Sequence, residues 1–303
     1  MIAAAGLAKR AVHALGLLGA WRRRHRSGVR ILMYHRFPAG ADGLRAQCEH
    51  IRRHYHPVSL AQVADSLYGG PPLPPHAVAI TIDDGYRDFV TVAHPVFHAC
   101  DIPTTIFVVS DFLDGKGWLW HDIVAYALGT ARNGGGRQRA AICDRLKRLP
   151  PAERERAVES LVRDLEVDLP ARPPAEYAPM TWDDARRLAA AGVEIGAHTR
   201  THPILSTVTD RARLRDEIVA PKARIEAELR RPALHFCYPN GRRSDFTDEA
   251  VGLLRTAGFR TAVTTERGIN FAGAPPFLLR RLGVEPSNPM PYFAELLAGV
   301  RTQ

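Results

Sequence analysis

The segment Val78–Phe89 constrains the fold most, because it joins an uncharged run of β-branched and small residues to two adjacent carboxylates. An uncharged run such as Val78–Ile82 is typical of a strand buried on both faces, as in a parallel sheet covered by helices. Asp83, Asp84 and Gly85 follow it directly. The pattern therefore predicts an α/β fold with two acidic side chains at the carboxyl end of a strand, where such folds place their active sites.

Short predicted strands alternate with predicted helices along most of the chain. Two of the helices begin at the capping residues Ser59 and Thr181. The alternation favours a parallel barrel or a distorted barrel over an open sheet. The predicted strands are 29–34, 78–82, 104–109, 193–197, 234–238, 261–264 and 277–284.

An arginine- and proline-rich segment, residues 116–179, interrupts this alternation. We predict that it is a helical insertion rather than a domain, because its apolar residues are too few for a core of their own. The domain prediction is therefore a basic N-terminal tail or helix over residues 1–28, and one domain over residues 29–303 that contains the insertion.

The positive charge of the chain is concentrated at its N-terminus. Residues 1–30 contain seven basic residues and no acidic one, so the rest of the chain carries only +2 of the net charge of +9. Basic and aromatic residues do not interleave, so we expect no nucleic-acid partner. The apolar run 11–21 is too short to span a bilayer and lacks the pattern of a signal peptide. A helix at an anionic membrane surface, a helix packed on the body and a loose segment remain alternatives for this tail.

The four cysteines are widely spaced and form no Cys-x-x-Cys pair, so nothing in the sequence requires a disulfide framework. A reducing compartment is the simplest inference. Together with the missing signal peptide, this predicts a cytoplasmic protein, with peripheral membrane contact through the tail left open.

His198 and His202 form a second polar group directly after a predicted strand. Two histidines four residues apart can face one another across one helical turn, and imidazole is a ligand for zinc, nickel, cobalt and iron(II). With Asp84 they would supply a two-histidine, one-carboxylate metal site that has open positions. The alternative for the acidic pair is a solvated turn. His121-Asp122 is another candidate ligand pair, but its position beside Trp118 and Trp120 in a helical segment favours packing.

Three segments resemble the motifs of the polysaccharide deacetylase family, also called the NodB-homology or carbohydrate esterase family 4 domain. Thr81–Gly85 resembles the first motif, with a catalytic base followed by a metal ligand. His198–Pro203 resembles the second, which supplies two histidine ligands, and Phe236–Gly241 resembles the third, which lines the substrate groove. The resemblance covers roughly residues 29–285 and implies a distorted (β/α)₇ barrel of the NodB-homology type.

The same resemblance implies roles for individual residues and a divalent metal cofactor, with zinc expected before nickel, cobalt or iron. The expected base is Asp83, the expected metal ligands are Asp84, His198 and His202, and the expected substrate-binding residues are Tyr238, Pro239 and Asn240.

Two departures from the common motifs bear on catalysis. The arginine that usually lies two residues before the proline of the third motif is Cys237 here, and no histidine lies near the C-terminus, where the usual catalytic acid is found. A branch of the family that handles exopolysaccharides has an early Met-Tyr-His segment, like Met33-Tyr34-His35, and a late arginine, as in Arg281–Val284. Resemblance to this branch implies His35 as the acid and Arg281 beside the base. The alternative for His35 is a core histidine bonded to backbone.

The expected function is that of a metal-dependent hydrolase that removes the N-acetyl group from amino sugars of a polysaccharide or oligosaccharide. Asp83 would deprotonate the attacking water, the backbone N–H of Tyr238 would help to stabilise the oxyanion, and His35 would protonate the leaving amine. Two alternatives remain: a deformylase or deacetylase of a lipid-linked amino sugar, suggested by the basic tail, and an inactive carbohydrate-binding relative, suggested by the missing arginine. In each case a carbohydrate is the expected partner.

Overall fold

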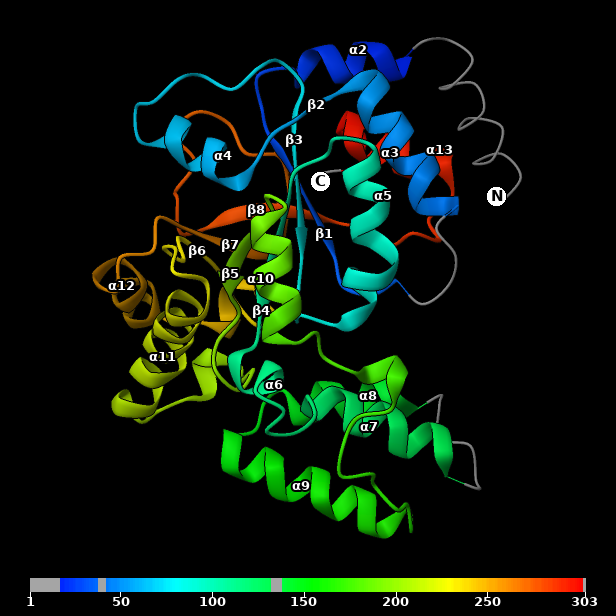
Figure 1. The fold of residues 1–303 in the computed structure, drawn as a ribbon, viewed down its shortest axis with the longest axis vertical. Helices are drawn as coiled ribbons and strands as arrows, with labels where there is room; N and C mark the ends of the chain where they lie inside the picture. The colour runs from blue at the N-terminus through cyan, green and yellow to red at the C-terminus, as the bar shows by residue number, and fades with distance from the viewer. Residues whose placement is uncertain (1–16, 38–41, 132–137, 302–303) are drawn as a thin grey trace.

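The structure is a computed structural model that describes residues 17–37, 42–131 and 138–301. Seven parallel strands form a closed barrel surrounded by helices (Figure 1), because β1 pairs with both β3 and β8. An additional short strand, β2 (His56–Pro57), pairs with the first residues of β3. The predicted (β/α)₇ barrel is therefore confirmed. Its strands are β1 (Arg30–Tyr34), β3 (Ala77–Ile82), β4 (Thr104–Val108), β5 (Glu194–Ala197), β6 (His235–Cys237), β7 (Thr261–Arg267) and β8 (Leu279–Gly283).

The barrel is irregular at two of its strand pairs. A single residue pair, Ala197 with Phe236, joins β5 to β6. The register between β7 and β8 shifts between Val263 and Arg267. A ladder with such interruptions does not have the uniform stagger of a regular barrel, which agrees with the predicted distortion.

Successive strand residues divide between the barrel interior and the layer beneath the helices. Ala77 and Ala79 of β3 belong to an inner hydrophobic cluster, whereas Val78 and Ile80 belong to the outer one. This alternation follows from the period of two of a β-strand. The bulky Phe107 fills the interior at a position where β5 carries glycine, since a Cβ on Gly196 would lie 2.6 Å from the Phe107 ring.

The helices around the barrel begin largely where the sequence predicts. Ser59 and Thr181 cap α4 and α10, each with a capping box. A π-helical turn, Phe89–Ala93, opens the predicted helix that ends as α5. The surrounding helices are α3 (Asp42–His54), α4 (Leu60–Leu67), α5 (His94–Ala99), α6 (Ser110–Leu113), α10 (Trp182–Ala190), α11 (Arg211–Leu229), α12 (Asp248–Thr256) and α13 (Met290–Ala298).

The described part of the N-terminal tail is a helix, α2 (Leu17–Arg24), which packs against α13. The face predicted to contact a membrane falls mainly in residues 1–16, outside the described residues. Among the described helices, none is both long and apolar enough to cross a bilayer. Membrane contact, cytoplasmic location and the absence of a nucleic-acid partner therefore stay predictions.

The insertion between β4 and β5 forms three helices that lie together below the barrel in Figure 1: α7 (Trp120–Thr130), α8 (Arg139–Leu146) and α9 (Pro151–Asp164). They pack around a hydrophobic cluster separate from the barrel core, built on Trp120, Val124, Leu128, Leu146 and Val158. The expectation that this segment lacks a core of its own was wrong, because a few large side chains suffice to join three short helices. The division into one domain with an insertion stays a prediction.

Candidate metal and active site

Side chains from the carboxyl ends of several strands meet in one cleft of about 390 Å³. His35 follows β1, Asp83 and Asp84 follow β3, and His198 and His202 follow β5. Parallel strands place all their carboxyl ends at one end of a barrel. Residues up to 167 positions apart in the sequence are therefore brought together, as the sequence predicts.

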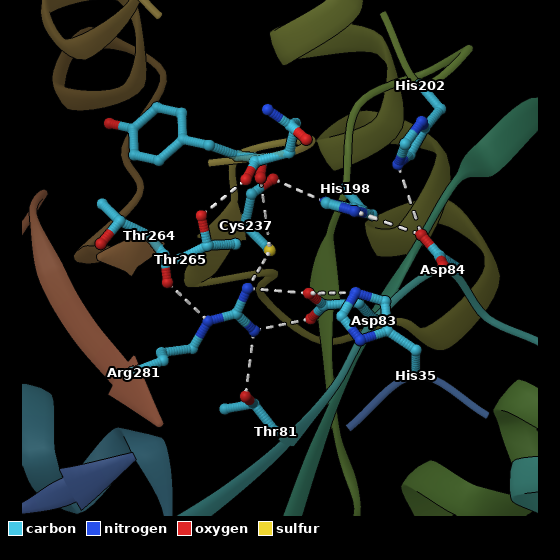
Figure 2. A network of polar contacts seen from close by, with 12 residues as sticks. His35, Thr81, Asp83, Asp84, His198, His202, Cys237, Thr264, Thr265 and Arg281 are labelled. Atoms are coloured by element: carbon cyan, nitrogen blue, oxygen red, sulfur yellow. Dashed lines mark hydrogen bonds and ion pairs between the residues drawn. The ribbon is translucent and has the colours of Figure 1, made fainter. Parts of the chain in front are cut away.

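Asp84, His198 and His202 converge on one point (Figure 2). The Nε2 atoms of His198 and His202 lie 3.3 Å and 3.4 Å from Asp84 Oδ1. All three side chains are buried, and their candidate ligand atoms lie within 4.8 Å of one another. Two imidazoles and one carboxylate suit zinc, iron(II), nickel or cobalt.

The hydrogen bond on the far side of His198 fixes its orientation. His198 Nδ1 lies 2.7 Å from the carbonyl oxygen of Cys237. Because a carbonyl only accepts, Nδ1 carries the proton and donates, and Nε2 presents its lone pair toward Asp84. This is the usual arrangement of a metal-ligating histidine, so the residues present fit a divalent ion.

A second group, Asp83, His198 and Cys237, also has its ligand atoms within 4.8 Å of one another. It suits a metal less well, because the Arg281 guanidinium already contacts both Asp83 and the Cys237 sulfur. A fixed positive charge at these atoms opposes a second cation. The group with Asp84 is therefore the better metal site.

The segment that carries the two histidines is an irregular loop rather than the helical turn that their spacing would allow. Thr199 and His202 have positive φ angles of 66° and 60°, which do not occur in a right-handed helix. The two rings nevertheless lie 4.9 Å apart between centroids. The loop brings them together through these left-handed residues rather than through a helical turn.

Glu217 of α11, which the sequence analysis did not identify, holds this loop. Its carboxylate accepts hydrogen bonds from the backbone N–H groups of Arg200 and Thr201, at 3.0 Å and 2.8 Å, and from the Thr201 hydroxyl at 2.5 Å. Glu217 is 1% exposed. A buried carboxylate needs such donors. Glu217 therefore positions the loop without contacting the candidate ligand atoms.

Asp83 forms a buried, two-pronged ion pair with Arg281 (Figure 2). Arg281 Nη1 and Nη2 each lie 2.7 Å from one oxygen of Asp83. Thr81 Oγ1, the Thr264 carbonyl and the Cys237 sulfur accept the remaining guanidinium hydrogens. Burial alone would raise the pKa of Asp83, but the charge and hydrogen bonds of Arg281 hold it below its ordinary value. Asp83 is thus ionised at neutral pH.

His35 lies at the edge of the cleft, beside Asp83. Its Nε2 is 3.5 Å from Asp83 Oδ2, and its side chain is 44% exposed. This exposure contradicts the alternative of a core histidine. The imidazole is within reach of a molecule bound over Asp83.

The three predicted substrate-binding residues differ in their positions. Asn240 lines the cleft, and its φ of 60° turns the loop after β6. Pro239 is buried and is not among the cleft-lining residues. The Tyr238 ring is buried, with its hydroxyl donating to the Phe277 carbonyl at 3.1 Å and its face stacked on Phe246. The Tyr238 ring is therefore not available to the cleft.

The predicted oxyanion donor was wrong. The backbone N–H of Tyr238 donates to the carbonyl oxygen of Val263, 3.3 Å away, and so extends the pairing of β6 with β7. A donor that is already used by the sheet is not free for a reaction intermediate. Sequence alone did not show this, because the pairing depends on where β7 lies beside β6.

The insertion also contributes to the cleft, through Trp120, His121, Cys143 and Lys147. The His121 ring lies 5.2 Å from that of His202, between centroids. Asp122 is buried and accepts a hydrogen bond from the Tyr86 hydroxyl at 2.7 Å. Asp122 is therefore a buried packing residue, as the sequence favours, whereas His121 lines the cleft.

Comparisons with known proteins agree with this geometry. The sequence model of the family described as polysaccharide deacetylase matches residues 70–262. A segment of 74 residues, 24% of this chain, is 40% identical to the poly-β-1,6-N-acetyl-D-glucosamine N-deacetylase of Escherichia coli K12, and spans 11% of that protein.

Several solved structures share the fold. IcaB from Ammonifex degensii has a TM-score of 0.63 at 20% identity, over 90% of this chain and 98% of that one. The BpsB deacetylase domain from Bordetella bronchiseptica has a TM-score of 0.59 at 20% identity, over 85% and 96%. The Streptococcus pyogenes deacetylase PplD, solved with acetate, has a TM-score of 0.60 at 19% identity, over 86% and 94%. Since the family model spans well over half of a chain whose barrel carries the motif residues in one cleft, the protein belongs to the polysaccharide deacetylase family.

Proposed function

We propose that this protein is a metal-dependent hydrolase that removes acetyl groups from the N-acetylated amino sugars of a polysaccharide or oligosaccharide. The observation that carries the proposal is the single cleft in which the Asp84, His198 and His202 cluster lies beside the ion-paired Asp83. The E. coli relative that is named a poly-β-1,6-N-acetyl-D-glucosamine N-deacetylase suggests the first substrate to test.

Asp84, His198 and His202 would hold the divalent ion. Such an ion would supply Lewis-acid polarisation of the acetyl carbonyl and of the attacking water. The protein would contribute the orientation of the ligands, through the Cys237 carbonyl behind His198 and through Glu217 behind the loop.

Asp83 would act as the general base that takes a proton from water. A base must be unprotonated at the working pH, and Arg281 favours this state by pairing with both carboxylate oxygens. Arg281 would thus pair with the base in place of the arginine that the common third motif has at the position of Cys237. That geometry weakens the main argument for an inactive relative.

His35 would act as the general acid. An amide nitrogen leaves as an amine only if it is protonated as the C–N bond breaks. The His35 Nε2 atom is 3.5 Å from Asp83 and reaches into the cleft from β1. Acid and base would therefore lie side by side at the cleft.

Acetate release from β-1,6-linked N-acetylglucosamine oligomers and from chitin oligomers tests the proposal. Protein loaded with zinc, cobalt or nickel should release acetate, chelator-treated protein should not, and re-addition of metal should restore the activity. His198→Ala and Asp83→Asn should each lose at least about a hundredfold in kcat/KM. Full activity of Asp83→Asn would refute the assigned base. Metal binding without acetate release from any acylated amino sugar would favour an inactive relative.

The alternative of a lipid-linked amino sugar rests on the basic tail, of which residues 1–16 lie outside the described residues. Acetate or formate release from a short-chain lipid-linked amino sugar, compared with the free oligomers, distinguishes the two substrates.

A further inference from the structure

The charged side chains at the rim of the cleft are of one sign. Lys147, directly after α8, and Arg242, in the loop after β6, both line it. Asp83 and Asp84 are the only acidic side chains among the described residues that line the same cleft, and both are buried. The accessible part of the cleft therefore presents cations.

Neither cation is neutralised by a close partner. Lys147 Nζ lies 3.6 Å from Asp144 Oδ1, an exposed carboxylate one turn earlier, and pairs of this kind contribute little. Within the described ranges, no ion pair involves the Arg242 guanidinium, and the nearby Asp245 carboxylate accepts from the Arg242 backbone N–H at 2.8 Å. Among the described residues, Lys147 is thus held only by this exposed pair and Arg242 by no ion pair, so both side chains can turn to a ligand.

The base of the cleft does not cancel this charge. Arg281 neutralises Asp83. A divalent ion at Asp84 and its two histidines would leave the base with a net positive charge. The low dielectric of a cleft strengthens such a field relative to an open surface.

We infer that the preferred substrate carries an anionic group, a carboxylate or a phosphate, attached to or near the N-acetylated amino sugar. The inference rests on the proposed deacetylase function and specifies its substrate class. Lys147 and Arg242 bind the anionic group while the acetamide lies over Asp83. The amine produced by each deacetylation becomes an ammonium, which the same two cations repel. Stretches that are already deacetylated are therefore poor ligands, and products leave.

The test compares kcat/KM for acetate release by the metal-loaded full chain on three substrates. These are a neutral β-1,6-linked N-acetylglucosamine oligomer, an oligomer that alternates N-acetylglucosamine with glucuronate, and N-acetylglucosamine 1-phosphate. We expect at least one anionic substrate to exceed the neutral oligomer by about fivefold or more, and the advantage to shrink at high salt. The two anionic substrates distinguish a uronate from a phosphate as the preferred group.

Charge variants assign the effect to the two residues. Lys147→Gln and Arg242→Gln should each lower the anionic-to-neutral ratio of kcat/KM by about threefold to fivefold, and Lys147→Glu should lower it further. Arg148→Gln is the matched control, because Arg148 directly follows Lys147, is exposed and does not line the cleft. It should leave the ratio as it is.

The possible failures are distinguishable. Equal kcat/KM on neutral and anionic substrates, or a ratio unaffected by Lys147→Glu, overturns the inferred preference for an anionic substrate. The proposed deacetylase function would still stand. No acetate from any of the three substrates, with metal bound, overturns the proposed function itself.

Discussion

Removing the guanidinium of Arg281 should destabilise the protein strongly at neutral pH. Arg281 is 1% exposed and Asp83 2% exposed, and two hydrogen bonds of 2.7 Å join them. Arg281→Met would leave a buried carboxylate without its counter-charge, which typically costs about 3–5 kcal/mol. Typical domains unfold with about 5–15 kcal/mol. A loss of this size is therefore a large fraction of the total.

The cost should depend on pH, with a sign that the structure gives. In the wild type the pKa of Asp83 lies below its ordinary value, so its stabilising contribution is present above that value and is lost as the pH falls through the lowered pKa. Without Arg281, burial dominates and raises the pKa of Asp83. As the pH falls, Asp83 becomes protonated in the variant, and the destabilisation caused by its unpaired buried charge becomes smaller. The difference in stability between wild type and variant should be largest near neutral pH and smaller in weak acid.

Urea unfolding of metal-free protein at neutral and mildly acidic pH measures this difference. The double variant Asp83→Asn/Arg281→Met should be more stable than Arg281→Met alone, with a coupling of about 2 kcal/mol or more. Arg260→Met is the control, because its partner Asp65 is 53% exposed and the pair should contribute less than about 1 kcal/mol. A loss below about 1 kcal/mol for Arg281→Met, or one that does not shrink in acid, would refute the reasoning.

Two further predictions concern residues that sequence reasoning did not place in the site. Glu217→Gln keeps the shape of the side chain but removes its charge and one of the two oxygens that accept hydrogen bonds from the loop, so metal affinity should fall by about tenfold or more. The metal retained after dialysis against a chelator measures the affinity. Glu226→Gln, on the same helix, is the control. Asp122 is buried, which raises its pKa from 3.8 to about 7. The stability that its protonated form provides is complete at low pH and is lost as the pH rises to about 7. Asp122→Asn should therefore be more stable than wild type above about pH 8, by up to about 4 kcal/mol at about 1.4 kcal/mol per pKa unit. Near pH 4 the two proteins should be equally stable. Urea midpoints of variant and wild type that differ by the same amount at pH 4 and pH 8 would contradict this.

The barrel and the convergence of its motif residues could be predicted from sequence for one physical reason. Uncharged runs such as Val78–Ile82 are buried strands, and parallel strands end at one side of a barrel. Asp83, Asp84 and His198 could thus be assigned to one site before any contact was known, whereas Arg281 was placed beside the base only by the resemblance. Their resemblance to family motifs added the expected roles.

Contacts between neighbouring elements could not be predicted in the same way. The N–H of Tyr238 is used by Val263 because β7 lies beside β6, and the loop before His202 takes its shape from Glu217 on a later helix. His121 faces the cleft only because the insertion packs where it does. Each of these depends on tertiary packing, for which a local pattern carries no signal.

Two of the candidate metal ligands have left-handed backbone, so the side chains that would bind the metal lower the stability of the fold. Asp84, Thr199 and His202 have φ angles of 75°, 66° and 60°, where a side chain with a Cβ costs about 1 kcal/mol or more relative to glycine. Replacing Asp84 or His202 by glycine would therefore relieve backbone strain while removing a ligand. A lineage released from selection for activity could gain stability as it lost the site, and relatives that keep the barrel but carry glycine at these two positions are expected to be the more thermostable members.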